Sequence, residues 1–120
     1  MKEIGGLGRE AMVELLYDGS GMLMERTIGL EGDAVSVRGR YRPLLQRVFE
    51  ADAAGFVLVH NHPSGDPRPS AADLAATRRL AALAGALEVE FYDHLIVGGR
   101  SVVSMRQAGF MPGTGKRSAA

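Results

Sequence analysis

The stretch from His60 to Asp73 constrains what this chain can fold into more than any other segment. A continuous apolar run, Phe56 to Val59, precedes it, and so short a run is typical of a buried strand. His60 and His62 follow at the end of that run. A loop rich in proline and glycine comes next, and a helix is predicted to begin near Ser70. The order strand, loop, helix would give each polar side chain a rigid support.

Two imidazoles and one carboxylate in this stretch are spaced as metal ligands. His60 and His62 are two residues apart, so both can face one side at the end of a strand. Asp73 falls in the first turn of the predicted helix, and the loop folds it back toward the imidazoles. Two histidines and one carboxylate leave a fourth tetrahedral position for water, which is the pattern of a catalytic zinc. Zinc suits these ligands, although manganese, iron or nickel could also bind them.

Each of these residues also has a plainer interpretation. Ser70 and Asp73 are spaced as a helix capping box, in which both side chains satisfy backbone N–H groups. Either histidine, taken alone, could be an exposed loop residue. Their concentration favours the metal interpretation, because two of the chain's three histidines lie in one loop beside a helix-starting acid. We therefore expect one metal ion per chain, bound by His60, His62 and Asp73.

Length and composition describe one small domain. The chain has 120 residues, of which 46% are hydrophobic, enough for a single core. Acidic and basic residues balance at 14 each, so no net charge attracts nucleic acid or anionic membranes. Cysteine is absent, which excludes disulfides and thiolate metal sites. We expect a cytoplasmic protein, since we find neither a secretory leader nor an apolar run of membrane-spanning length.

Hydrophobic patterns and turn residues predict the order β-β-α-β-α-β-β. Strands are expected over 11–17, 22–28, 56–59, 89–97 and 101–105, with a further short strand considered at 34–37. Helices are expected from Pro43 and over about 70–85. This order predicts an α/β domain with a central mixed, mostly antiparallel sheet and two flanking helices. We expect a loose lead-in over 1–9, the domain over 10–111 and a frayed tail over 112–120.

The motif and its surroundings resemble a known family. The run from His60 to Gly65, then Pro69-Ser70, Asp73 and Thr77, is similar to the signature of the RadC-like branch of the JAB/MPN+ (JAMM) metalloproteases. The segment from Asp93 to Gly98 resembles another stretch of that branch, and the likeness covers about residues 10–110. The resemblance implies a cytidine-deaminase-like JAB/MPN fold and a zinc-activated water that hydrolyses peptide or isopeptide bonds.

The resemblance also implies roles for individual residues. The three predicted ligands would bind zinc, and Ser70 would donate a hydrogen bond to the developing oxyanion. An upstream glutamate would be the general base. Glu10 stands just before the first strand, where the family places its base. The rival Glu14 lies inside that strand. A glutamate among apolar residues would be explained without catalysis if the strand were at an edge of the sheet or if Glu14 formed a salt bridge.

The resemblance suggests a substrate as well. Many members remove ubiquitin or ubiquitin-like modifiers from lysines, so a ubiquitin-like protein or its conjugate is the expected partner. The alternative is the role attached to RadC-like sequences, an accessory protein acting with DNA. Four arginines form a basic cluster in the sequence: Arg38, Arg40, Arg42 and Arg47. In the DNA alternative they would bind a phosphate backbone, whereas the default interpretation is a solvated face. Members of this branch usually carry a proline-arginine-glutamate segment before the first long helix. This chain departs from that pattern, because it has Arg40-Tyr41-Arg42-Pro43 there.

Two further residues near the motif are weaker candidates. Thr77 lies one helical turn after Asp73, so its hydroxyl either orients that ligand or bonds back into its own helix. Asp93 and His94 are expected to order a strand near the site rather than to bind the metal.

Overall fold

The computed structural model describes residues 10–30 and 41–111. Its elements follow in the order β1 (Ala11–Tyr17), β2 (Leu23–Leu30), α2 (Arg42–Glu50), β3 (Gly55–Asn61), α3 (Ala71–Ala86), β4 (Glu90–Gly98) and β5 (Ser101–Ser104). The predicted order of strands and helices is confirmed in this part of the chain. The expected lead-in at 1–9, the short strand considered at 34–37 and the tail at 112–120 lie outside the described residues.

The five strands form one mixed sheet in the order β2-β1-β3-β4-β5. β3 and β4 are parallel and are joined by α3, and the other neighbouring pairs are antiparallel. The predicted mixed, mostly antiparallel sheet is therefore confirmed. Because β1 runs against β3, the start of β1 lies beside the end of β3, with Met12 opposite His60. This register brings Glu10 to the end of the sheet that carries the histidines.

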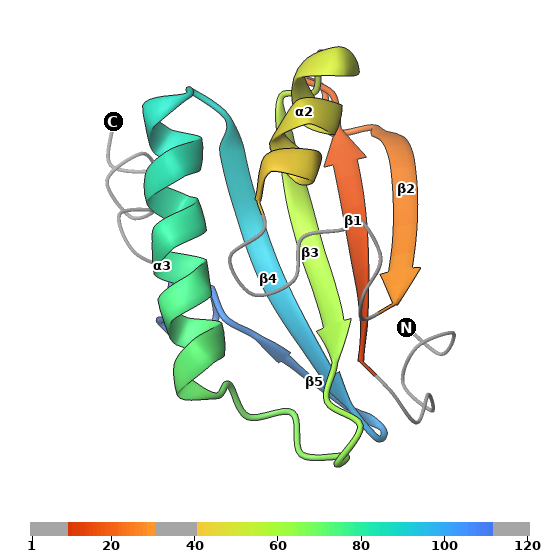
Figure 1. Ribbon diagram of the computed structural model, residues 1–120, viewed down its shortest axis with the longest axis vertical. Coiled ribbons are helices and arrows are strands. Elements are labelled where there is room, and N and C mark those ends of the chain that lie inside the picture. The colour runs from red at the N-terminus through yellow and green to blue at the C-terminus, as the bar shows by residue number, and fades with distance from the viewer. Residues whose placement is uncertain (1–9, 31–40, 112–120) are drawn as a thin grey trace.

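Both helices pack against the same face of the sheet (Figure 1). Leu44 of α2 and Leu80 of α3 belong to one buried cluster with Phe56 of β3. A smaller cluster on the opposite face contains Ala11, Val13, Val59 and Val97. Side chains alternate along a strand, so His60 faces the helices, as Phe56 does. Neither α2 nor α3, the helices within the described ranges, is long and apolar enough to span a bilayer.

Helix α2 carries Pro43 in its first turn, as the sequence predicts. Its apolar residues do not all face the core, because Val48 is fully buried whereas Phe49 is 54% exposed. Successive residues of a helix are turned by roughly 100°, so the helix directs Val48 toward the sheet and Phe49 away from it. Arg47, expected on the outer face, instead reaches Glu14 of β1 and forms an ion pair with it.

Candidate metal centre

The two histidines are held at the end of the central strand β3. His60 lies in β3, between β1 and β4, and is only 3% exposed. His62 follows the end of β3, where its backbone N–H donates to the carbonyl of Val97 at 2.8 Å. This bond continues the pairing of β3 with β4 and fixes the backbone from which the His62 ring projects.

The loop after His62 packs closely against the end of β4. A Cβ atom added at Gly98 would lie 2.6 Å from the nitrogen of Pro67 and 2.7 Å from the carbonyl oxygen of Gly65. Only glycine allows this approach. The ring Nδ1 of His62 lies 2.8 Å from the carbonyl oxygen of Asp66. Because a carbonyl can only accept, Nδ1 carries the proton, and the lone pair of the neutral ring is on Nε2.

The third predicted ligand is fixed by the start of α3. Ser70 is the N-cap residue, and its Oγ accepts a hydrogen bond from the Asp73 N–H at 3.0 Å. Oδ2 of Asp73 accepts in return from the Ser70 N–H at 2.9 Å. The capping box that the spacing allowed is therefore present. It holds the Asp73 carboxylate in one orientation, so capping and metal binding are compatible roles.

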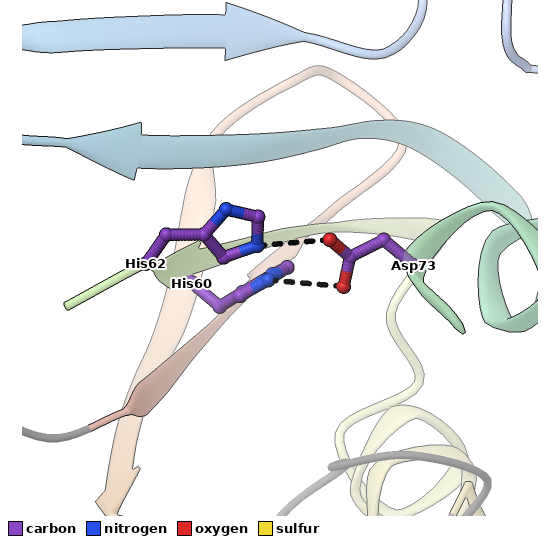
Figure 2. A group of neighbouring side chains, drawn as sticks. All are labelled: His60, His62 and Asp73. Atoms are coloured by element: carbon purple, nitrogen blue, oxygen red, sulfur yellow. Dashed lines mark hydrogen bonds and ion pairs between the residues drawn. The ribbon is translucent and has the colours of Figure 1, made fainter. Parts of the chain in front are cut away.

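Figure 2 shows the two imidazoles turned toward the carboxylate of Asp73. Nε2 of His62 lies 2.8 Å from Oδ2, and Nε2 of His60 lies 3.3 Å from Oδ1. One ligand atom from each of the three residues lies within 4.8 Å of the others. Ligand atoms around a tetrahedral zinc are roughly 3.4 Å apart, given bonds near 2.1 Å. The three residues can therefore bind one metal ion with small adjustments.

Two features of the three side chains fit a cation. The His62 Nε2 lone pair faces a carboxylate oxygen at 2.8 Å, and two acceptors so close repel each other unless positive charge lies between them. His60 Nε2 is buried and has no hydrogen-bond partner within the described ranges. Its 3.3 Å approach to Asp73 lacks hydrogen-bond geometry. Buried nitrogens are rarely left unpaired, so this atom is suited to a metal bond.

The electrostatics of the site favour the metal-binding forms of its side chains. Burial would raise the pKa of Asp73, but the nearby His60 ring and the hydrogen bonds with Ser70 lower that pKa well below its usual range. Asp73 is therefore ionised at neutral pH. Burial is the main cause that lowers the pKa of His94, to about 3, and the adjacent His60 imidazole acts in the same direction, so the His94 ring is neutral.

A buried polar row behind His60 is the part of the site that sequence reasoning missed. His60 Nδ1 lies 2.7 Å from Nε2 of His94, whose Nδ1 lies 2.7 Å from the hydroxyl of Thr77. That hydroxyl also donates to Sδ of Met105 at 3.3 Å. Both alternatives for Thr77 are thus wrong about its partner, which is neither Asp73 nor its own helix. Thr77 lies midway between two leucines at helical spacing, and that position could have predicted a buried hydroxyl.

Asp93 ties the first half of β4 to the end of β5 and so orders a strand near the site, as expected. Its carboxylate accepts hydrogen bonds from the backbone N–H groups of His94 at 2.7 Å and Arg106 at 3.0 Å, and from the hydroxyl of Ser104. These contacts fix the strand that carries His94.

Glu10 lies near the predicted ligands. It precedes β1 and lines a cavity of about 30 Å³ together with His60 and Asp73. That volume has room for at least one water molecule. The amide of Asn61 fastens the neighbouring backbone, because its Oδ1 accepts from the Ala11 N–H at 2.6 Å. The start of β1 is thereby tied to the end of β3.

Glu14 has a structural role. It is 1% exposed and forms an ion pair with Arg47 of α2. The salt bridge anticipated as the plain explanation for a glutamate inside this strand is therefore present. Glu14 is absent from the residues that line the cavity beside Glu10.

The arginine cluster does not form one surface in the parts of the chain that the structure describes. Arg47 is engaged with Glu14, while Arg42 lies with Arg79 along a groove between α2 and α3. Arg38 and Arg40 lie outside the described residues. The ion pair of Arg47 removes one of the four charges invoked for binding a phosphate backbone.

Comparison with known proteins shows the family of this chain. The model of the family described as "RadC-like JAB domain" matches residues 1–110. UPF0758 protein YsxA of Bacillus subtilis is 32% identical over 92% of this chain and 48% of its own length. UPF0758 protein YfjY of Escherichia coli is 34% identical over 91% of this chain and 68% of its own length. The chain thus spans about half the length of the first of these relatives and about two thirds of the second. On the match to the family model and these identities, the chain belongs to the RadC-like JAB domain family.

Proposed function

We propose that this chain is a zinc-dependent hydrolase that cleaves peptide or isopeptide bonds after the C-terminal tail of a ubiquitin-like protein. The convergence of His60, His62 and Asp73 beside a cavity lined by Glu10 carries the proposal. Membership of the RadC-like JAB domain family supports a hydrolase, while the names of the relatives state no activity.

Zinc is the proposed metal because two imidazole nitrogens and one carboxylate oxygen are a common catalytic zinc set. When bound, Zn²⁺ would polarise the scissile carbonyl and make a water acidic enough to ionise near neutral pH. His60 and His62 would each offer Nε2, and Asp73 would offer a carboxylate oxygen. Burial of His60 and the capping box at Asp73 restrict both ligands before any metal arrives, which favours binding.

Glu10 is the proposed general base. It would accept a proton from the attacking water and return that proton to the nitrogen of the leaving amine. Its place on the wall of the small cavity, with two of the ligands, puts it within reach of a water there. Glu14 is a poorer candidate, since its carboxylate pairs with Arg47.

Ser70 is the proposed donor to the oxyanion. Its Oγ already accepts from the Asp73 N–H, but a hydroxyl can accept and donate at the same time. The residue is exposed at the start of α3, so a substrate carbonyl can reach it. A donor held by a helix cap is preorganised, which is the property that stabilises a developing negative charge.

An extended tail is the form of substrate that the sheet can receive. β5 is an edge strand and pairs with Leu95–Gly98 of β4, the stretch whose other side accepts the His62 N–H at the Val97 carbonyl. Addition of a substrate strand at such an edge would run the tail toward the ligands.

Metal analysis and an amide-hydrolysis assay test the proposal. The purified chain should hold about one zinc ion per chain, and His62→Ala should lose it. The zinc-loaded chain is then assayed on ubiquitin-like proteins that carry a C-terminal aminocoumarin amide. Glu10→Gln should keep zinc but lose about 10²- to 10⁴-fold in rate, whereas the control Glu50→Gln, at an exposed end of α2, should match the parent.

Three outcomes would count against the proposal. A chain that binds no zinc refutes the metal centre. Zinc binding without cleavage of any amide in the panel refutes the substrate class. Full activity in Glu10→Gln refutes its assignment as base. Tight DNA binding that weakens steeply with salt would support the accessory role instead.

A further inference from the structure

A row of buried polar groups runs from the metal centre into the core. It passes from His60 in β3 to His94 in β4, then to Thr77 in α3 and Met105 after β5. The four residues are 3%, 4%, 1% and 0% exposed, in that order. With so little access to water, the donors and acceptors of these four groups must find their hydrogen-bond partners within the row.

The direction of the hydrogen bonds follows from what each group can donate. Thr77 has one hydroxyl proton, and Met105 Sδ at 3.3 Å can only accept it. The Thr77 oxygen is then left to accept from Nδ1–H of His94. A neutral His94 with its proton on Nδ1 has its lone pair on Nε2, and this lone pair accepts from Nδ1–H of His60. The lone pair of His60 is consequently on Nε2.

The opposite direction leaves a buried donor unused. If Thr77 donated to His94, then His94 would donate from Nε2 to His60, and His60 would carry its proton on Nε2. That atom has no hydrogen-bond partner within the described ranges, so the buried N–H would be unsatisfied at a cost in free energy. The first direction leaves Nε2 with a lone pair, the form that a metal ion requires.

We propose that Thr77 and His94 are positioning residues that fix His60 in the tautomer protonated on Nδ1, with Nε2 ready to bind the metal ion. Both act through His60 and would not themselves bind the metal. The inference rests on the proposed metal centre but not on the proposed reaction. Hydrogen-bonding partners of metal-bound histidines typically contribute 10- to 100-fold to metal affinity.

The first test is the tautomer of His60 in the metal-free chain. Long-range ¹H–¹⁵N NMR spectra at mildly alkaline pH, where imidazoles are neutral, report which ring nitrogen carries the proton. We expect Nδ1–H on both His60 and His94. Thr77→Val removes the hydroxyl with little change in size and should shift His60 toward Nε2–H, while Thr77→Ser should keep the parent spectrum. His60 protonated on Nε2 in the parent chain overturns the proposal.

The second test is zinc affinity, measured by competition with a chromophoric chelator. Thr77→Val should bind zinc about 10- to 100-fold more weakly than the parent, and Thr77→Ser should bind within about threefold of it. Equal affinities for these two variants overturn the proposal. If Thr77→Val does not fold, the tautomer of His60 in the parent chain still decides whether the proposal holds. If the parent binds no zinc, the metal centre is refuted, and the tautomer still decides the inference.

Discussion

The backbone carbonyl of Asp66 accepts a hydrogen bond from Nδ1 of His62 at 2.8 Å. The loop that carries Asp66 therefore decides which nitrogen of His62 faces Asp73. The position of that loop depends in turn on how closely it packs against the end of β4. Ligand geometry at this site is thus set by backbone contacts on both sides of His62.

Gly98→Ala should disturb the loop and weaken the metal site. The new Cβ would lie 2.6 Å from the Pro67 nitrogen, a backbone atom that cannot move alone. We expect a loss of about 1–3 kcal/mol in the free energy of unfolding and at least tenfold weaker zinc binding. Chemical denaturation and chelator competition measure the two effects. Gly85→Ala in α3 is the control, because nothing lies within 4 Å of its added Cβ. Equal zinc affinities in both variants would contradict this role of Gly98.

Arg47→Met should separate the structural glutamate from the proposed catalytic one. It leaves the carboxylate of Glu14 buried without its ion-pair partner, and removing one member of a buried pair costs about 3–5 kcal/mol. Because Arg47 is 24% exposed, we expect a smaller loss, about 2–3 kcal/mol, in urea unfolding. The zinc content and hydrolysis rate of the folded variant should match the parent. If the hydrolysis rate of Arg47→Met falls as far as that of Glu10→Gln, the general-base role would instead be assigned to Glu14.

Ser70→Gly should distinguish the helix cap from the oxyanion donor. Glycine is tolerated as an N-cap, so the loss of stability should be only a few tenths of a kcal/mol. The hydroxyl donor is absent, and removal of one such donor costs about 10²- to 10³-fold in kcat. Thermal unfolding and the amide assay measure these effects on the same preparation, with Ser70→Thr as the conservative control. Unchanged kcat in Ser70→Gly would leave Ser70 with the capping role alone.

Acid should release zinc through the histidines rather than through Asp73. The pKa of Asp73 lies below its ordinary value of 3.8, so its carboxylate stays ionised until the pH falls below that value. An imidazole must be neutral to bind zinc, so protons compete with the metal for His60 and His62, and zinc affinity should fall as the pH is lowered from about 7 to about 4. Chelator competition across this range checks the expectation. Affinity that stays constant down to pH 4 would show that the histidines are not ligands.

Local patterns in the sequence were sufficient to predict the elements and the proximity of the three candidate ligands. The apolar run before His60 predicted β3, and the spacing of Ser70 and Asp73 predicted the capped start of α3. These features depend on residues close together in the chain, whose conformations follow from neighbouring side chains and backbone groups. The three predicted ligands are close for the same reason, since one short loop joins their strand and helix.

Contacts between distant segments were decided only by the tertiary structure. The antiparallel register of β1 and β3 places Glu10 near His60, while the packing of α2 pairs Glu14 with Arg47. The parallel pairing of β3 with β4 brings His94 against His60, and α3 then adds Thr77. Strand register and helix packing follow from burial of the whole core, which no local pattern encodes. The sequence by itself therefore determined which three residues could bind a metal ion, and the fold decided which residues surround and orient them.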